Sequence, residues 1–142
     1  MTWSILVVDD SAAARSQLRF ALEVKGARVI EAENGREGLW RAQAELFDLI
    51  VSDVHMPVMD GLQMIQELRK RPAYATTPIF VLTSDAAATR ASEGKKAGAT
   101  AWVVKPINPD LLWKAVEKVL FGRSSSSSAK ITTLRPTRTE SK

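Results

Sequence analysis

Short runs of Val, Ile and Leu recur along the chain, and most of them are apolar at nearly every position. A strand with one solvated face would alternate apolar and polar residues, whereas a strand buried on both faces of a parallel sheet gives a continuous apolar run. The pattern therefore predicts strands of a parallel sheet. The five runs are Ile5–Val8, Arg28–Ala32, Asp48–Ser52, Pro78–Leu82 and Thr100–Val104.

The intervals between these runs have apolar residues at helical spacing, with helix start and stop signals at their ends. Asn34 and the segment Asn108-Pro109-Asp110 are typical of helix N-termini, and Gly26 and Gly98 follow the ends of helical patterns. We therefore expect a helix after every strand. The five expected helices run from about Ala12 to Val24, from Gly35 to Glu45, from just after Asp60 to before Pro72, from Ala86 to Lys96, and from Pro109 onward with Leu112, Val116 and Val119 facing inward.

Strands that alternate with helices at this length predict a doubly wound α/β fold with right-handed crossovers. The expected architecture is a flavodoxin-like, five-stranded parallel sheet in the order 2-1-3-4-5 with five helices. In such a sheet, functional residues gather beyond the carboxyl ends of the strands. The residues that follow each strand are therefore the first place to look for chemistry.

The composition narrows the chemistry further. The 142 residues suffice for one domain with its own core, and they include no cysteine, which excludes disulfides, thiolate metal sites and cysteine nucleophiles. The N-terminus has no basic segment before its apolar run, and no stretch approaches the roughly 20 apolar residues of a membrane span. We expect a cytoplasmic protein with no signal peptide and no membrane association.

The net charge of +4 belongs to the C-terminal end alone. Residues 122–142 hold five cations against one anion, so the rest of the chain is neutral. Five consecutive serines open this segment, and a Thr-, Arg- and Pro-rich sequence closes it. Such a segment buries too little apolar surface to offset the entropy of ordering it. We predict a domain over residues 1–121 and a disordered, basic, Ser/Thr-rich tail over 122–142.

Polar side chains follow four of the five predicted strands. Asp9 and Asp10 come after the first strand and Asp53 after the third, while Thr83 and Lys105 follow the fourth and fifth. Clustered carboxylates repel one another, and a bound Mg²⁺ relieves that repulsion with oxygen ligands. A carboxylate can also attack phosphorus to form an aspartyl phosphate, with a lysine and a cation neutralising the developing charge. The set therefore predicts phosphoryl transfer to a carboxylate of this group.

The run Asp53-Val-His-Met-Pro-Val-Met-Asp-Gly61, together with the pair Asp9-Asp10, Thr83 and Lys105-Pro106, resembles the response-regulator receiver domain. The resemblance covers about residues 4–121, with the motifs in the family's order and spacing. The stretch from Glu93 to Pro106 is most similar to chemotaxis-type (CheY-like) single-domain members. The resemblance implies a receiver domain over residues 1–121.

The resemblance also implies roles for the carboxylates. Asp53 would accept a phosphoryl group from a phosphohistidine of a sensor histidine kinase. Asp9, Asp10 and Asp53 would hold Mg²⁺ together with the backbone carbonyl of His55. The residues two beyond Asp53 and two beyond Thr83, here His55 and Asp85, influence the dephosphorylation rate in the family.

A second group of residues would transmit the signal. By resemblance, Thr83 would move toward the phosphate, Lys105 would pair with it, and Trp102 would swing inward as Thr83 moves. The surface formed by the helix at 86–96, the strand at 100–104 and the last helix would then bind a downstream protein. We expect a monomeric switch that catalyses only its own phosphotransfer and dephosphorylation, without a fused output domain and without direct DNA binding.

Two other functions stay open on the sequence. A phosphohydrolase with an aspartate nucleophile can use a similar sheet. Such enzymes resemble one another in carrying the motif Asp-x-Asp after the first strand. This chain has Asp9-Asp10-Ser11 there, and its candidate nucleophile follows the third strand. A receiver that binds its partner regardless of phosphate is the other alternative, which the intact acidic set disfavours.

Overall fold

The computed structural model describes residues 2–84, 95 and 97–124, and for residues 122–124 it describes the backbone alone. The helix predicted at Ala86–Lys96 therefore falls outside the described residues, apart from Lys95, which is helical. Asp85, which was expected to influence the dephosphorylation rate, also falls outside them. Residues 1–106 and residues 107–142 form two separate units, and each is described by itself.

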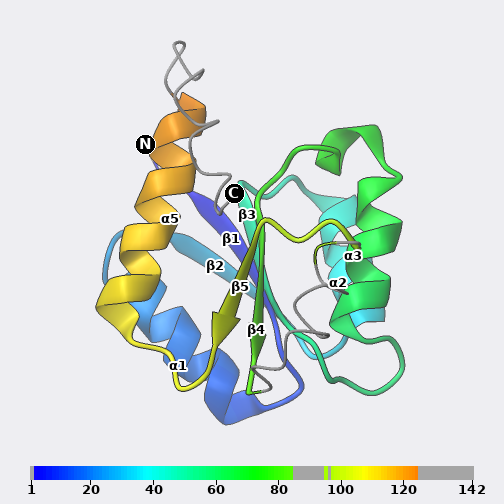
Figure 1. Cartoon of the computed structure of the whole chain (residues 1–142), viewed down its shortest axis with the longest axis horizontal. Coiled ribbons are helices and arrows are strands. Elements are labelled where there is room, and N and C mark those ends of the chain that lie inside the picture. The colour runs from blue at the N-terminus through cyan, green and yellow to red at the C-terminus, as the bar shows by residue number, and fades with distance from the viewer. Residues whose placement is uncertain (1, 85–94, 96, 125–142) are drawn as a thin grey trace. The chain divides into compact units, whose positions relative to one another are not determined.

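The first unit contains a five-stranded parallel sheet with the order β2-β1-β3-β4-β5, which confirms the predicted topology (Figure 1). Every predicted strand is present within one residue of its expected ends. The strands are β1 (Ser4–Val8), β2 (Arg28–Ala32), β3 (Leu49–Asp53), β4 (Ile79–Thr83) and β5 (Ala101–Val104).

The shifted strand ends have a common cause. Backbone pairing, not side-chain polarity, decides where a strand stops, so the polar residues Asp53 and Thr83 still belong to their ladders. Asp53 is in register with Leu82 on β4, and Thr83 is in register with Val104 on β5. Because the strands are parallel, these residues reach the same carboxyl edge of the sheet.

Helices α1 (Ala12–Glu23), α2 (Gly35–Ala44) and α3 (Gly61–Arg69) follow the first three strands. Figure 1 shows α1 on the opposite face of the sheet from α2 and α3. On the face that carries α2 and α3, the strand residues Leu6, Val8 and Ile50 form one buried cluster with Met64 and Ile65 of α3. Burial of these large apolar side chains is the main force that fixes the helices on the sheet.

The predicted N-caps are confirmed. The Asn34 side chain accepts a hydrogen bond from the backbone of Glu37 at the start of α2. Asn108 does the same for Asp110 and Leu111 at the start of α5 (Pro109–Ser124). Asp60, with Gln63, forms a capping box at the start of α3, which holds the loop that follows Asp53.

The last helix differs from its prediction at one end. Its predicted inward residues Leu112, Val116 and Val119 are buried, as is Leu120. The helix continues to Ser124, past the predicted domain boundary at residue 121. A glycine inside a helix costs only about 1 kcal/mol, which a helix of this length tolerates. Among the described residues, no helix is long and apolar enough to cross a membrane.

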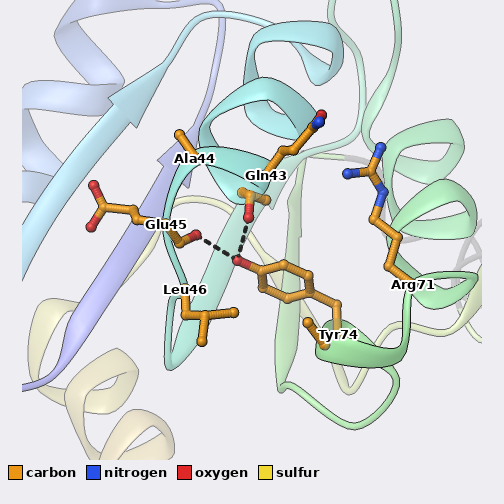
Figure 2. Close-up of a pocket in the computed structure, with 8 residues that line it drawn as sticks. Gln43, Ala44, Glu45, Leu46, Arg71 and Tyr74 are labelled. Carbon is orange, nitrogen blue, oxygen red and sulfur yellow. Dashed lines mark hydrogen bonds between the residues drawn. The ribbon is translucent and has the colours of Figure 1, made fainter.

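A short 3₁₀ helix, η1 (Pro72–Tyr74), was not predicted. The Tyr74 hydroxyl lies 2.8 Å from the carbonyl oxygen of Ala42 and 2.9 Å from that of Glu45, so it caps the C-terminal end of α2 (Figure 2). A pocket of about 350 Å³ lies between these two elements. None of the site residues predicted from the sequence lines this pocket.

Candidate functional site

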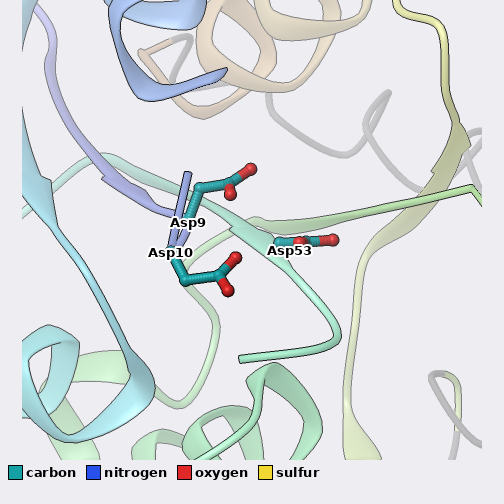
Figure 3. Close-up of side chains that lie close together, drawn as sticks. All are labelled: Asp9, Asp10 and Asp53. Carbon is teal, nitrogen blue, oxygen red and sulfur yellow. The ribbon is translucent and has the colours of Figure 1, made fainter. Parts of the chain in front are cut away.

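Three carboxylates meet at the carboxyl edge of the sheet. Asp9 and Asp10 follow β1 directly, and Asp53 is the last residue of β3. One carboxylate oxygen from each lies within 4.8 Å of those from the other two (Figure 3). Asp9 is buried, Asp53 is half-buried and Asp10 is exposed, so the cluster opens to solvent on one side.

Lys105 supplies a cation to this cluster. Its Nζ atom lies 3.5 Å from Oδ2 of Asp9 and 3.6 Å from Oδ1 of Asp53. The backbone N–H of Lys105 donates to the carbonyl oxygen of Thr83 at 2.7 Å, which fixes the start of its side chain at the end of β4. Among the described residues, Lys105 pairs with two of the three carboxylates, so the cluster keeps a surplus of negative charge.

The pKa of Asp53 reflects its burial first and that surplus second. Burial raises the pKa of its carboxyl, the charge of Asp9 raises it further, and Lys105 and the backbone N–H of Val54 oppose the shift. Oδ1 of Asp53 accepts the Val54 N–H at 2.9 Å. Among the described residues, Oδ2 of Asp53 accepts no hydrogen bond, so one carboxylate oxygen is available for chemistry.

The residues of the cluster fit Mg²⁺. The ion prefers carboxylate oxygens, takes few of them from the protein and keeps several waters. Three carboxylates from two strand ends, one of them exposed, offer this kind of partial ligand set. Burial is the main cause of the raised pKa of Asp53, and the repulsion from Asp9 that adds to it is what a bound cation would relieve.

The turn between β1 and α1 holds Asp9 from several directions. Its backbone N–H donates to the carbonyl oxygen of Ala32 at 3.1 Å, and its Oδ1 accepts the N–H of Ser11 at 2.9 Å. Nη1 of Arg15 donates to its carbonyl oxygen at 2.7 Å. Sequence reasoning missed Ser11 and Arg15, because neither residue type marks a site at that spacing.

The loop between β3 and α3 explains the Asp60-Gly61 part of the motif. The N–H of Gly61 donates to the carbonyl oxygen of Val54 at 2.8 Å, and the helix start lies directly against the backbone of Asp53. A Cβ atom at position 61 would collide with the Asp53 carbonyl oxygen. Glycine therefore allows α3 to close on the strand end that carries Asp53.

The residues predicted to transmit the signal lie nearby. Thr83 is buried at the last position of β4, at the same edge as Asp53. Trp102 is in register with Val81 on β4 and is partly buried; its indole nitrogen is buried and has no hydrogen-bond acceptor among the described residues. His55 is exposed in the loop after β3. The structure thus places all these residues in the first unit, and their roles stay predictions.

Comparison with known proteins agrees with this geometry. The family model of the response regulator receiver domain matches residues 5–117. The chain is 34% identical to Protein PilH of Pseudomonas aeruginosa over 118 residues, which cover 83% of this chain and 98% of PilH. The solved structure of the chemotaxis response regulator CheY4 of Vibrio cholerae matches with a TM-score of 0.80 and 42% identity, over 84% of this chain and all of CheY4.

A longer relative matches in part. The chain is 37% identical to the transcriptional regulatory protein ResD of Bacillus subtilis over 124 residues, which cover 87% of this chain and 50% of ResD. The similarity thus extends along nearly the whole of PilH and CheY4 and along half of ResD.

Proposed function

Because this chain belongs to the response regulator receiver domain family, we propose that it is a switch in which Asp53 accepts a phosphoryl group from a sensor histidine kinase. The chain is a CheY-like receiver domain of a two-component response regulator and therefore a signalling protein. This membership disfavours the phosphohydrolase reading. The observation that carries the proposal is the half-buried Asp53 carboxylate between Asp9 and Lys105, one oxygen of which accepts no hydrogen bond from the described residues.

The chemistry follows from the positions of these groups. In our proposal, the free oxygen of Asp53 forms a bond to phosphorus while the bond between phosphorus and the kinase histidine breaks. Lys105, which already faces Asp53, pairs with the incoming negative charge. The Thr83 hydroxyl donates a hydrogen bond to a phosphoryl oxygen. The domain itself catalyses this transfer and the later hydrolysis, and it turns over no other substrate.

Receiver domains generally bind Mg²⁺ through acidic residues, and we propose Asp9, Asp10, Asp53 and the carbonyl oxygen of His55 as the ligands here. The ion supplies neutralisation of the phosphoryl oxygens when it is bound. Asp9 and Asp53 also hold Lys105 between them, so the same carboxylates keep the lysine oriented when no phosphoryl group is present.

The output of the switch begins at Thr83 and Trp102. We propose that Thr83 moves toward the phosphoryl group and that the Trp102 ring turns inward in response. A buried indole N–H that lacks an acceptor among the described residues is costly, so this ring has a reason to change its position. The changed surface at β5 would bind a downstream protein.

The similarity to PilH and CheY4 along nearly their whole length supports a chemotaxis-type regulator. We propose a cytoplasmic monomer that acts by binding a protein target and does not contact DNA directly. The neutral charge of residues 1–121 fits this role, because a DNA-binding domain carries a basic surface.

The test of the switch uses Trp fluorescence. Beryllofluoride, which mimics a phosphoryl group, is added with Mg²⁺ to the wild type, to Asp53→Asn and to Trp102→Phe. We expect a change in emission in the wild type and none in Asp53→Asn. The change should also disappear in Trp102→Phe, although that variant keeps three other tryptophans. A wild type that gives no change, or an Asp53→Asn variant that responds equally, would contradict the switch.

A further inference from the structure

Arg15 joins the acidic cluster to the neighbouring strand. The side chain leaves α1 and is mostly buried, with 15% of it exposed. Its Nη1 donates to the carbonyl oxygen of Asp9 at 2.7 Å, and its Nε donates to Oε1 of Glu31 on β2 at 2.9 Å. One guanidinium therefore ties the end of β1 to β2 and α1.

Glu31 holds this guanidinium in place. Its second oxygen accepts Nη1 of Arg19 at 2.9 Å, and Arg19 also pairs with Glu23 one turn further along α1. The hydrogen bond from Arg19 lowers the pKa of Glu31, with a further contribution from Arg15 and against a smaller opposing effect of burial. Glu31 is thus an ionised anchor that neutralises the charge of Arg15.

The contact with the Asp9 carbonyl bears on two carboxylates. That carbonyl belongs to the peptide plane that leads into Asp10, while the Asp9 N–H, bonded to Ala32, fixes the plane before it. Asp10 is exposed, and its side chain makes no hydrogen bond among the described residues. The peptide plane that Arg15 holds therefore fixes the backbone from which the Asp10 side chain extends.

We propose that Arg15 is a positioning residue for Asp9 and Asp10, held in turn by Glu31, and that it increases the affinity of the cluster for Mg²⁺. The inference rests on the proposed function. It assigns a role in Mg²⁺ binding to a positively charged side chain next to the Mg²⁺ site, where its charge alone would weaken that binding.

The sign of the effect separates the two roles. A guanidinium acts as a positive charge that repels Mg²⁺, so its removal would tighten binding if charge were what mattered. If position matters, its removal loosens the turn and weakens binding. Residues that orient metal ligands typically change affinity 10–100-fold when they are replaced. For a cluster that is open to solvent we expect about tenfold, the lower end of that range.

The experiment titrates Mg²⁺ into the unphosphorylated protein and follows backbone amide shifts around Asp10 and Asp53 by NMR. Arg15→Met removes both contacts, and Arg15→Lys keeps the charge but lacks the planar fork that reaches Asp9 and Glu31 together. We expect both variants to bind Mg²⁺ about tenfold more weakly than the wild type. Arg19→Met is the matched control, since it loses the same partner, Glu31, without touching Asp9, and we expect its affinity to stay within about twofold.

Equal or tighter binding in Arg15→Met would overturn the positioning role, and so would wild-type affinity in Arg15→Lys. A loss in Arg19→Met as large as that in Arg15→Met would assign the effect to Glu31 alone and would also overturn it. Beryllofluoride binding to the wild type separates this failure from a failure of the switch itself. If the wild type binds neither Mg²⁺ nor beryllofluoride, both proposals fall. If it binds both while Arg15→Lys behaves normally, only the inference on Arg15 falls.

Discussion

Asp53 sits where burial and like charges both disfavour its ionised form. Its raised pKa means that the folded protein binds a proton at this carboxyl more tightly than the unfolded chain does. As the pH rises from the ordinary value of 3.8 through the raised pKa, ionisation of Asp53 therefore lowers the free energy of unfolding. Above that window the full penalty is present.

Replacement of the charge should therefore stabilise the fold. At pH 7 and without divalent cations, we expect Asp53→Asn to unfold with a free energy higher than that of the wild type by on the order of 1 kcal/mol, a typical size for one substitution. The gain should shrink as the pH falls toward and below 3.8, because both side chains are then neutral. Urea denaturation at several pH values measures both effects.

Asp110→Asn is the control for this comparison, since Asp110 is an exposed acid in the first turn of α5. We expect it to be neutral or slightly destabilising, because an acid at a helix N-terminus interacts favourably with the helix dipole. An Asp53→Asn variant that is less stable than the wild type at pH 7 would show that the carboxylate is not under strain.

The sequence allowed some residues of the site to be identified and left others hidden. Asp9, Asp10, Asp53 and Lys105 could be found because each directly follows or ends a parallel strand, and all such ends share one edge. Arg15 could not, because a long side chain on a helix can reach many partners and the sequence does not say which. The positive φ of Val58, 71°, was equally hidden, since a β-branched residue seldom adopts it.

The elements were predictable where apolar runs and caps coincide. Strand positions followed from the continuous runs, and the starts of α2 and α5 followed from Asn34 and Asn108. The short η1 was not predicted, because a three-residue helix is too short to show a periodic pattern of apolar residues. Its place depends on Arg69, which donates hydrogen bonds to the carbonyl oxygens of Tyr74 and Thr77 at 2.7 Å each and to that of Gly98 at 2.8 and 3.0 Å.

Arg69 thus joins the end of α3, the η1 turn and the segment that leads into β5. We expect Arg69→Met to lower the free energy of unfolding by about 2–4 kcal/mol, because it leaves several partly buried carbonyl groups without donors. Arg69→Lys should recover little of this, since one ammonium cannot reach all three carbonyls. Urea denaturation followed by circular dichroism measures the loss.

Lys70→Met is the matched control, as Lys70 is highly exposed and pairs with Glu67 on the surface. Exposed ion pairs contribute about 0–1 kcal/mol, so we expect a change of that size at most. A loss below about 1 kcal/mol in Arg69→Met would contradict the connecting role of Arg69.

At the scale of the whole molecule, the order of strands and helices predicted the fold class and the sheet order, because parallel strands joined by right-handed crossovers allow few arrangements. The net charge of +4 gave no information about the site, since it belongs to residues 122–142. The kinase and the target could not be predicted, because a partner recognises the surface of a receiver domain and no local sequence motif identifies that partner.

We expect the whole chain to accept one phosphoryl group, at a single residue. The direct measurement is the intact mass of the protein after incubation with acetyl phosphate and Mg²⁺, with reductive trapping and peptide mapping to locate the group. We expect a mass gain of one phosphoryl group in the wild type, located at Asp53 and absent from Asp53→Asn. A wild type without that gain, or an Asp53→Asn variant with an equal gain, would contradict the account.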